Sequence, residues 1–289
     1  MDDAVIVAVN GGPGSTAALA WALQWTRHSK QQLLVCTIFD ADLFEADAVE
    51  PGRDEVLRRA RADVERLDPE ARPDYEVQFG KPREVLIDLS RDAAMIVLGA
   101  HEDEPVIGPF HGTLPLRVAD RASCPVVIVP SNWNGRRGNV VVGIDYETDD
   151  EAIRFGIVAA RAFGATLELV HGWQAAGYAA GAYYSWFETT EPIIADAEND
   201  LREIAEPIRL AHPELHVTTL AVEGRPMDVL VDRAVFAELL VVGTHHRGAL
   251  TGMMLGSVSH DLIVNLPCPV AVVPTDIRRK RRDGPPATR

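Results

Sequence analysis

The chain has 289 residues, of which 47% are hydrophobic and 25% charged, a composition typical of soluble globular proteins. It carries 28 Lys and Arg against 43 Asp and Glu, and the net charge of −15 disfavours nucleic acid or an anionic membrane surface as the main partner. We find no apolar run of the about 20 residues that a membrane-spanning helix needs, and no basic signal-peptide start, so we expect a cytoplasmic protein.

In the first part of the chain, short apolar runs alternate with amphipathic stretches. Buried strands are predicted at residues 5–9, 33–39, 75–79, 95–99 and 126–129. Helices fill the gaps: Ser15 is a candidate N-cap, Pro82 suits a first helical position, and Gly112-Thr113 begins a further helix. This alternation predicts an α/β fold, an open parallel sheet with helices on both faces.

The same motifs then occur a second time, so the chain is a tandem duplication. Asn10 after the first strand corresponds to Asp145, 135 residues later, whereas Gly80-Lys81-Pro82 corresponds to Gly224-Arg225-Pro226, 144 residues later. The second copy has therefore gained residues between these points, and we place them in the aromatic stretch 172–187. This stretch follows the second strand and is expected near the ligand crevice, as a lid, a partner surface or a small cluster under a loop.

The repeat also predicts the domain boundaries. The first domain covers residues 1–130, a polar linker 131–138, the second domain 139–275, and a basic, disordered tail 276–289. In each copy the fifth strand is a short apolar run after Cys-Pro. Because an unpaired apolar edge invites aggregation, we predict that the strands at 126–129 and 270–273 pair with each other.

Neither a disulfide framework nor a metal site is expected. The cysteines Cys36, Cys124 and Cys268 are odd in number and lack CxxC spacing, so we predict buried thiols. His245 and His246 are adjacent, so their side chains point apart, and no further ligand at helical spacing completes a metal site.

The candidate site lies beyond the carboxyl ends of the strands, where open parallel sheets bind ligands. In the second copy, Asp145 follows strand one, and Gly243, two residues, His246, nine residues and Gly256-Ser257 follow strand four. Glycine permits close backbone approach, and the free N–H groups of the helix after Gly256 form an anion site that can cradle phosphates. Ser257 adds a hydroxyl donor, and Asp145 is a candidate acceptor for adenosine. Alternatively, the glycines only turn the chain and Asp145 caps a helix.

These motifs resemble the universal stress protein family, whose ATP-binding members carry G-2x-G-9x-G-(S/T) after strand four and Asp after strand one. The resemblance covers essentially the whole chain, as two tandem domains. It implies two Rossmann-like domains, each with a five-stranded parallel sheet, paired through their fifth strands. It also implies ATP, ADP or AMP as ligand, with Mg²⁺ accompanying ATP, a regulatory role in stress response without a defined reaction, and a homodimer with an unidentified protein partner.

The resemblance implies ligand-binding positions in both copies and no catalytic residue. They are Asp145, Gly172, Gly243, His246, Arg247, Gly256, Ser257 and Val258 in the second copy, and Asn10, Ile38, Gly99, Gly112 and Thr113 in the first. The middle glycine of the pattern is replaced by His246 in one copy and by Glu102 in the other. Because the acidic run 102–104 would repel phosphates, we predict that the second copy is the better ATP site.

Two other functions stay open. One is a ligand-free interaction scaffold in which both glycine loops have diverged. The other is a nucleotide-activating enzyme, because residues 10–15 (NGGPGS) lie near the SGGxDS loop of ATP pyrophosphatases; Asn10 and Gly14 replace its Ser and Asp, however. His171, at the end of strand two, is a candidate either to flank adenine or to be a satisfied strand residue.

Overall fold

The computed structural model describes residues 3–40, 46–100, 114–135, 137–145, 150–173, 191–244 and 257–275. The strands of the first half are β1 (Ala4–Ala8), β2 (Leu33–Phe39), β3 (Asp74–Phe79), β4 (Ala93–Gly99) and β5 (Val126–Val129). Those of the second half are β6 (Asn139–Gly143), β7 (Leu167–Trp173), β8 (Val217–Glu223), β9 (Ala237–Gly243) and β10 (Val270–Val273). Every strand predicted in the first half is present, with ends within two residues of the prediction.

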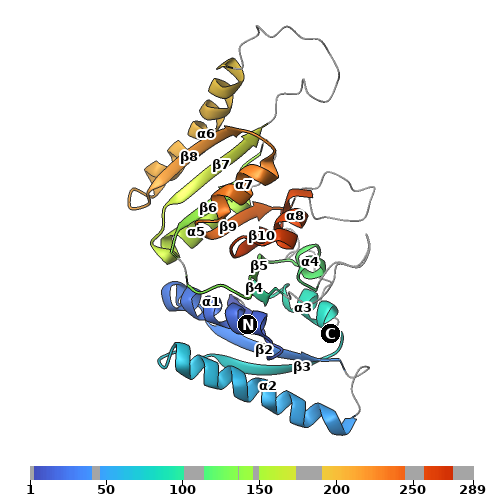
Figure 1. Cartoon of the computed structure of the whole chain (residues 1–289). Coiled ribbons are helices and arrows are strands. Elements are labelled where there is room, and N and C mark those ends of the chain that lie inside the picture. Colours follow the sequence, from blue (N-terminus) through green and yellow to red (C-terminus); the bar gives the residue numbers. More distant parts are fainter. Residues whose placement is uncertain are drawn as a thin grey trace, which may run out of the picture.

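The described strands form one ten-stranded sheet in the order β3-β2-β1-β4-β5-β10-β9-β6-β7-β8. All pairings within each half are parallel, as predicted. Between the halves β5 and β10 pair antiparallel, with Val270 opposite Ile128 and Val272 opposite Val126. This confirms the predicted pairing of the fifth strands, and it leaves β3 and β8 as the outer strands of a continuous sheet (Figure 1).

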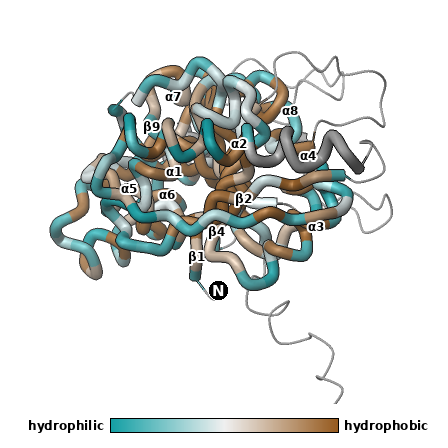
Figure 2. The backbone as a smooth tube through the Cα atoms, turned by 90° about the horizontal axis from the view of Figure 1, so that it is seen from below, coloured by the Kyte–Doolittle hydropathy of each residue, from teal (hydrophilic) through white to brown (hydrophobic). Residues whose placement is uncertain are grey.

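Eight described helices cover the two faces of the sheet. They are α1 (Pro13–Ser29), α2 (Ala46–Leu67), α3 (Pro82–Leu89), α4 (Leu114–Ala119), α5 (Asp150–Phe163), α6 (Glu191–Ala211), α7 (Pro226–Ala234) and α8 (Ser257–Asn265). Helices α1, α2, α5 and α6 pack into one apolar core, and α3, α4, α7 and α8 pack into a second core on the opposite face. Figure 2 shows hydrophobic segments in the interior and hydrophilic ones at the periphery.

The start of α1 differs from the prediction. The helix begins at Pro13 with Gly12 as its N-cap, so Ser15 lies inside the first turn, where its hydroxyl donates to the Gly12 carbonyl (2.9 Å). Proline suits the first helical position because its φ is already helical and it has no N–H to satisfy. The prediction that Pro82 opens a helix is confirmed by α3.

The extra residues of the second copy lie where they were predicted. Phe39 and Trp173 end equivalent strands and lie within one residue of the shorter spacing, whereas Leu67 and Ala211 end equivalent helices at the longer spacing. The gain therefore falls between β7 and α6. Residues 174–190 lie outside the described part of the chain, so the function of the aromatic stretch stays a prediction. All three cysteines are free and buried, as expected.

An aromatic cluster joins the halves beside the β5–β10 pair. Trp25 of α1 stacks on Phe155 of α5, with 5.7 Å between ring centroids, and meets Phe163 edge to face at 5.6 Å. Trp21 stacks on Trp25 at 5.5 Å, and both tryptophans are almost fully buried. Large buried aromatic rings contribute strongly to the stability of such an interface, so the cluster is a main stabilising contact between the halves.

We predict that Trp25→Ala lowers the free energy of unfolding by about 3–5 kcal/mol, because it leaves a cavity between α1 and α5. Urea denaturation followed by circular dichroism measures this loss. The matched control is Phe236→Ala, whose ring is 81% exposed, and we expect a change within about 0.5 kcal/mol. Equal losses in both variants would contradict the role given to the cluster.

Candidate functional site

The end of β9 is held firmly in place in the second half. Gly243 is the last residue of this strand, and the next residue, Thr244, donates its backbone N–H to the Val273 carbonyl (3.0 Å). The backbone N–H of Thr275 donates in turn to the Thr244 hydroxyl (3.1 Å). The chain therefore leaves β9 from a fixed position beside the end of β10.

The first turn of α8 lies next to this strand end. The helix begins at Ser257, as predicted, and the hydroxyl of Ser259 donates to the Gly243 carbonyl (3.1 Å). Ser259 is only 2% exposed, and Val258 beside it packs on the core in a half-buried position. This bond brings together the two ends of the glycine pattern. Sequence reasoning missed Ser259, whose only signal is a serine within an apolar helix face.

This arrangement can receive an anion. The first amides of an α-helix have no partner within the helix, and the helix dipole makes that end positive. Among the described residues, the atom nearest to where a Cβ on Gly243 would lie is the Ala152 Cβ, at the ordinary contact distance of 3.8 Å. Among the described residues, none therefore blocks close approach to the backbone of Gly243, and the N–H groups of the first turn of α8 lie beside it.

Asp145 reaches the same edge of the sheet from the adjacent strand. After β6 ends, the backbone N–H of Ile144 donates to the Val170 carbonyl (2.8 Å), and the His171 Nδ1 donates to the Ile144 carbonyl (2.7 Å). His171 is buried, and the bond from its Nδ1 fixes this end of β6. The choice between its two predicted roles stays a prediction. Asp145 follows in a half-buried position, and β6 pairs directly with β9.

Gly172 is explained by the packing of α7 against β7. A Cβ on this residue would lie 2.8 Å from the Pro226 Cα, so the glycine lets α7 approach β7 closely. A Cβ on Gly143 would lie 3.0 Å from the Leu230 side chain on the same helix. Helix α7 therefore rests directly on β6 and β7, and a ligand role for Gly172 stays a prediction.

The first half has an apolar cavity of about 160 Å³ at the carboxyl ends of β1, β2 and β4. Its lining brings together the three described candidates of this copy, Asn10, Ile38 and Gly99. Its other lining residues are Ala8, Val9, Ser15, Pro82, Leu86, Leu98, Leu114 and Pro115. The Asn10 Oδ1 accepts the Gly12 N–H (3.0 Å), so this side chain also shapes its own turn.

The glycines of the first half are required by helix packing. A Cβ on Gly99 would overlap the backbone of Gly14, and a Cβ on Gly14 would overlap the Ala100 carbonyl oxygen. The beginning of α1 is therefore pressed against the end of β4. This contact occupies one side of the loop 10–15 and disfavours its use as a pyrophosphate loop.

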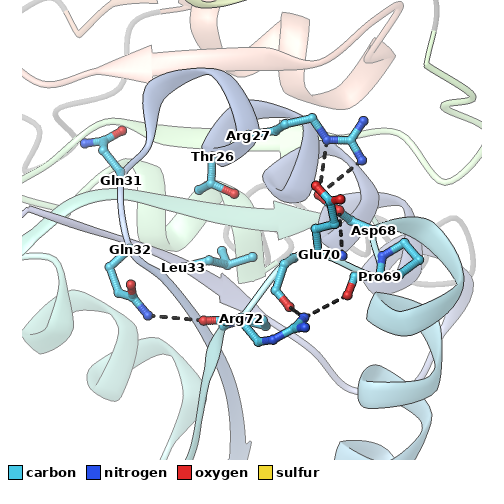
Figure 3. Close-up of a pocket in the computed structure, with 11 residues that line it drawn as sticks. Thr26, Arg27, Gln31, Gln32, Leu33, Asp68, Pro69, Glu70 and Arg72 are labelled. Carbon is cyan, nitrogen blue, oxygen red and sulfur yellow. Dashed lines mark hydrogen bonds and ion pairs between the residues drawn. The ribbon is translucent and has the colours of Figure 1, made fainter.

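A wider depression of about 750 Å³ lies at the opposite edge of the same sheet, where α1 ends and β2 and β3 begin (Figure 3). Its polar side chains bond to one another and to the local backbone: Arg27 pairs with Asp68 (3.1 Å), and Arg72 donates to the Pro69 carbonyl (2.7 Å). These bonds hold the loop between α2 and β3 in shape. The depression lies at the amino ends of β2 and β3, whereas the glycine patterns follow the carboxyl ends of β4 and β9.

The described residues contain no group of three or more His, Cys, Asp or Glu side chains that could hold a metal ion. None of the described helices has both the length and the apolar character required to cross a bilayer.

Comparison with known proteins decides the family. The sequence profile described as the universal stress protein family matches residues 1–130 and 136–274. The chain belongs to the universal stress protein family. The chain is 28% identical over 290 residues to Universal stress protein Rv2005c of Mycobacterium tuberculosis, covering 93% of this chain and 96% of that protein. It is 32% identical over 212 residues to Universal stress protein Rv1996 of the same organism, covering 70% of this chain and 66% of that protein.

The fold is also that of a solved family member. The crystal structure of a universal stress protein from Archaeoglobus fulgidus superposes with a TM-score of 0.65 at 20% identity, covering 94% of this chain and 98% of that one. The two matches to the family profile and this superposition support the tandem arrangement of the fold.

Five candidate residues of this universal stress protein lie outside the described part of the chain: Gly112, Thr113, His246, Arg247 and Gly256. Ser257 is described as the start of α8, without its side chain. Their contacts with a ligand stay predictions. The domain boundaries, predicted at 130, 138 and 275, likewise stay predictions.

We predict that the equivalent glycines of this universal stress protein respond differently to the same change. Gly99→Ala should lower the free energy of unfolding by about 1–3 kcal/mol, because the added methyl group pushes α1 away from β4. Gly243→Ala meets only ordinary contact with a described neighbour and should cost less than about 1 kcal/mol. Urea denaturation of both variants measures the difference. Similar losses would mean that both glycines serve helix packing.

Proposed function

We propose that this protein binds an adenine nucleotide, ATP, as a regulatory ligand in the second half of the chain, without a defined catalytic reaction. One observation carries the proposal: the bond from Ser259 to the Gly243 carbonyl places the N-terminal amides of α8 beside a glycine at the end of β9 that no described residue crowds. Phosphate oxygens favour such a place, because backbone N–H groups and the helix dipole act together. Membership of the universal stress protein family supports the same reading.

The residues around the end of β9 match the adenosine and phosphate parts of the nucleotide. Asp145 lies at the end of the adjacent strand, where its carboxylate is an acceptor for hydroxyl or amino groups of adenosine. Gly256, the Ser257 hydroxyl, His246 and Arg247 are assigned to the phosphates, and Val258 flanks them. ADP and AMP share the adenosine contacts, and Mg²⁺ would accompany the phosphates of ATP.

The first half is proposed as the weaker site. Its cavity, lined by Asn10, Ile38 and Gly99, offers apolar surface for a base. Its glycines have a packing explanation, however, and the acidic run 102–104 follows β4 in the sequence. Like charges repel phosphates strongly in a partly desolvated site, which supports unequal binding by the two halves.

Calorimetric titration with Mg-ATP tests the proposal. We expect binding by the unmodified protein, and Gly243→Asp should weaken it by about tenfold or more, since a carboxylate would face the phosphates. Gly256→Asp should act in the same way, whereas Gly112→Asp should change little. Thermal unfolding of each variant checks that the fold is retained.

The titration separates the alternatives. Loss of binding in the first-half variant, with binding retained in the second-half variants, would reverse the assignment of the sites. No binding by the unmodified protein, and no nucleotide released when the purified protein is denatured, would favour the ligand-free scaffold. Formation of AMP and pyrophosphate from ATP would favour the nucleotide-activating enzyme, against which the contact between Gly14 and Ala100 already counts.

We also propose that the chain acts in the cytoplasm as a homodimer. The interface between fifth strands is used within the chain, so a second copy must bind another surface. Light scattering at micromolar concentration is expected to give twice the chain mass of 31.5 kDa. The mass of a single chain would contradict the proposal.

A further inference from the structure

A buried carboxyl group lies where the two halves and the linker meet. Glu238 is the second residue of β9, and it is 2% exposed. The pairing of β6 with β9 shifts at this point: Asn139 is opposite Ala237, but Val140 is opposite Leu239, so Glu238 is the extra residue of a bulge.

The first half contains the same bulge without the acid. There Ala4 is opposite Ala93 and Val5 is opposite Met95, which makes Ala94 the equivalent extra residue. The bulge therefore does not need a carboxyl group to form. The acid at Glu238 is specific to the copy whose bulge faces the linker, and burying it requires partners.

The partners of Glu238 come from two segments outside β9. Gln24 of α1, in the first half, donates its side-chain N–H to the Glu238 Oε1 (3.1 Å). The backbone N–H of Gly138, at the end of the linker, donates to the same carboxyl group. Gly138 is itself tightly placed, because a Cβ there would overlap the Phe236 carbonyl oxygen. The carboxyl group thus ties β9 to α1 and to the linker.

The surroundings of the carboxyl group offset its charge only partly. Burial raises the pKa of Glu238 to about 7, while the hydrogen bonds from Gln24 and Gly138 and the positive charge of Arg137 act in the opposite direction. The other titratable group that it faces among the described residues is the Cys268 thiol, just before β10. The pKa of that thiol is raised to about 12, first by burial and then by the charge of Glu238, so it stays neutral.

We propose that Glu238 is a proton-controlled latch between the two halves of the chain. In its neutral form, the carboxyl group keeps α1, β9 and the linker packed together. When it ionises, a charge is left in a poorly hydrated position, and opening of the junction relieves this cost by admitting water.

The direction of the pH dependence follows from linkage. The carboxyl group has its ordinary pKa of 4.5 when exposed in the open junction and about 7 in the closed one. The closed junction is therefore most favoured below pH 4.5, loses its advantage as the pH rises toward 7, and changes little above pH 7.

Amide hydrogen exchange of Gly138 tests the latch directly, because this N–H is one of its bonds. The readout is the ratio of exchange rates in the unmodified protein and in Glu238→Gln, measured at pH 5.5 and pH 8, so that the intrinsic pH dependence of exchange cancels. Glutamine keeps the acceptor oxygen and cannot ionise. We expect the ratio to rise by about tenfold or more between the two pH values.

Further variants keep the test decisive. Glu238→Ala, which copies Ala94 of the first half, serves in place of the glutamine variant if that one does not fold. Arg137→Gln removes the nearby positive charge, which raises the closed-state pKa, so the rise in exchange should continue to higher pH. Glu223→Gln changes an exposed carboxyl group at the end of β8, and its ratio should not vary with pH. A ratio for Glu238→Gln that is the same at both pH values would overturn the latch.

Discussion

The antiparallel contact between β5 and β10 is the constraint on which the rest of the structure depends. It joins two parallel five-stranded sheets into one and buries both strands completely. Because the two halves run in opposite directions across this contact, their carboxyl strand ends lie at opposite edges of the sheet. The two candidate crevices are thereby separated, and each must be completed by residues of its own half.

The same contact decides which helices meet. It brings α1 against α5 on one face of the sheet and α4 against α8 on the other. The linker leaves β5 at its carboxyl end and enters β6 at its amino end, and these ends share one edge of the sheet. The aromatic cluster around Trp25 and the buried acid Glu238 are consequences of this geometry, since both lie between α1 and the second half.

Much of the fold could be predicted from the sequence because its signals are local. Runs such as residues 33–39 are apolar throughout, as strands buried on both faces must be, and the repeat of Gly-x-Pro and Cys-Pro-Val fixes the order of the units. Close packing between distant backbones gives no such signal. Gly99 and Gly243 look equivalent in the sequence, yet Gly99 meets the backbone of Gly14, whereas no described backbone atom comes so near to Gly243. The bond from Ser259 was missed for the same reason, because its acceptor is a carbonyl on another element.

Comparison of the two copies within one chain separates what the fold needs from what a site needs. Ala94 shows that the bulge forms without an acid, and Pro115 shows that the first turn after the glycine loop forms without the serine found at position 259. A feature present in only one copy is therefore not required for the fold to form. In a chain of net charge −15, the proposed anionic ligand would be drawn by local groups rather than by the overall field. Backbone amides held by Ser259 suit this task, because their dipoles are fixed by the fold and add no charge to be neutralised when the ligand is absent.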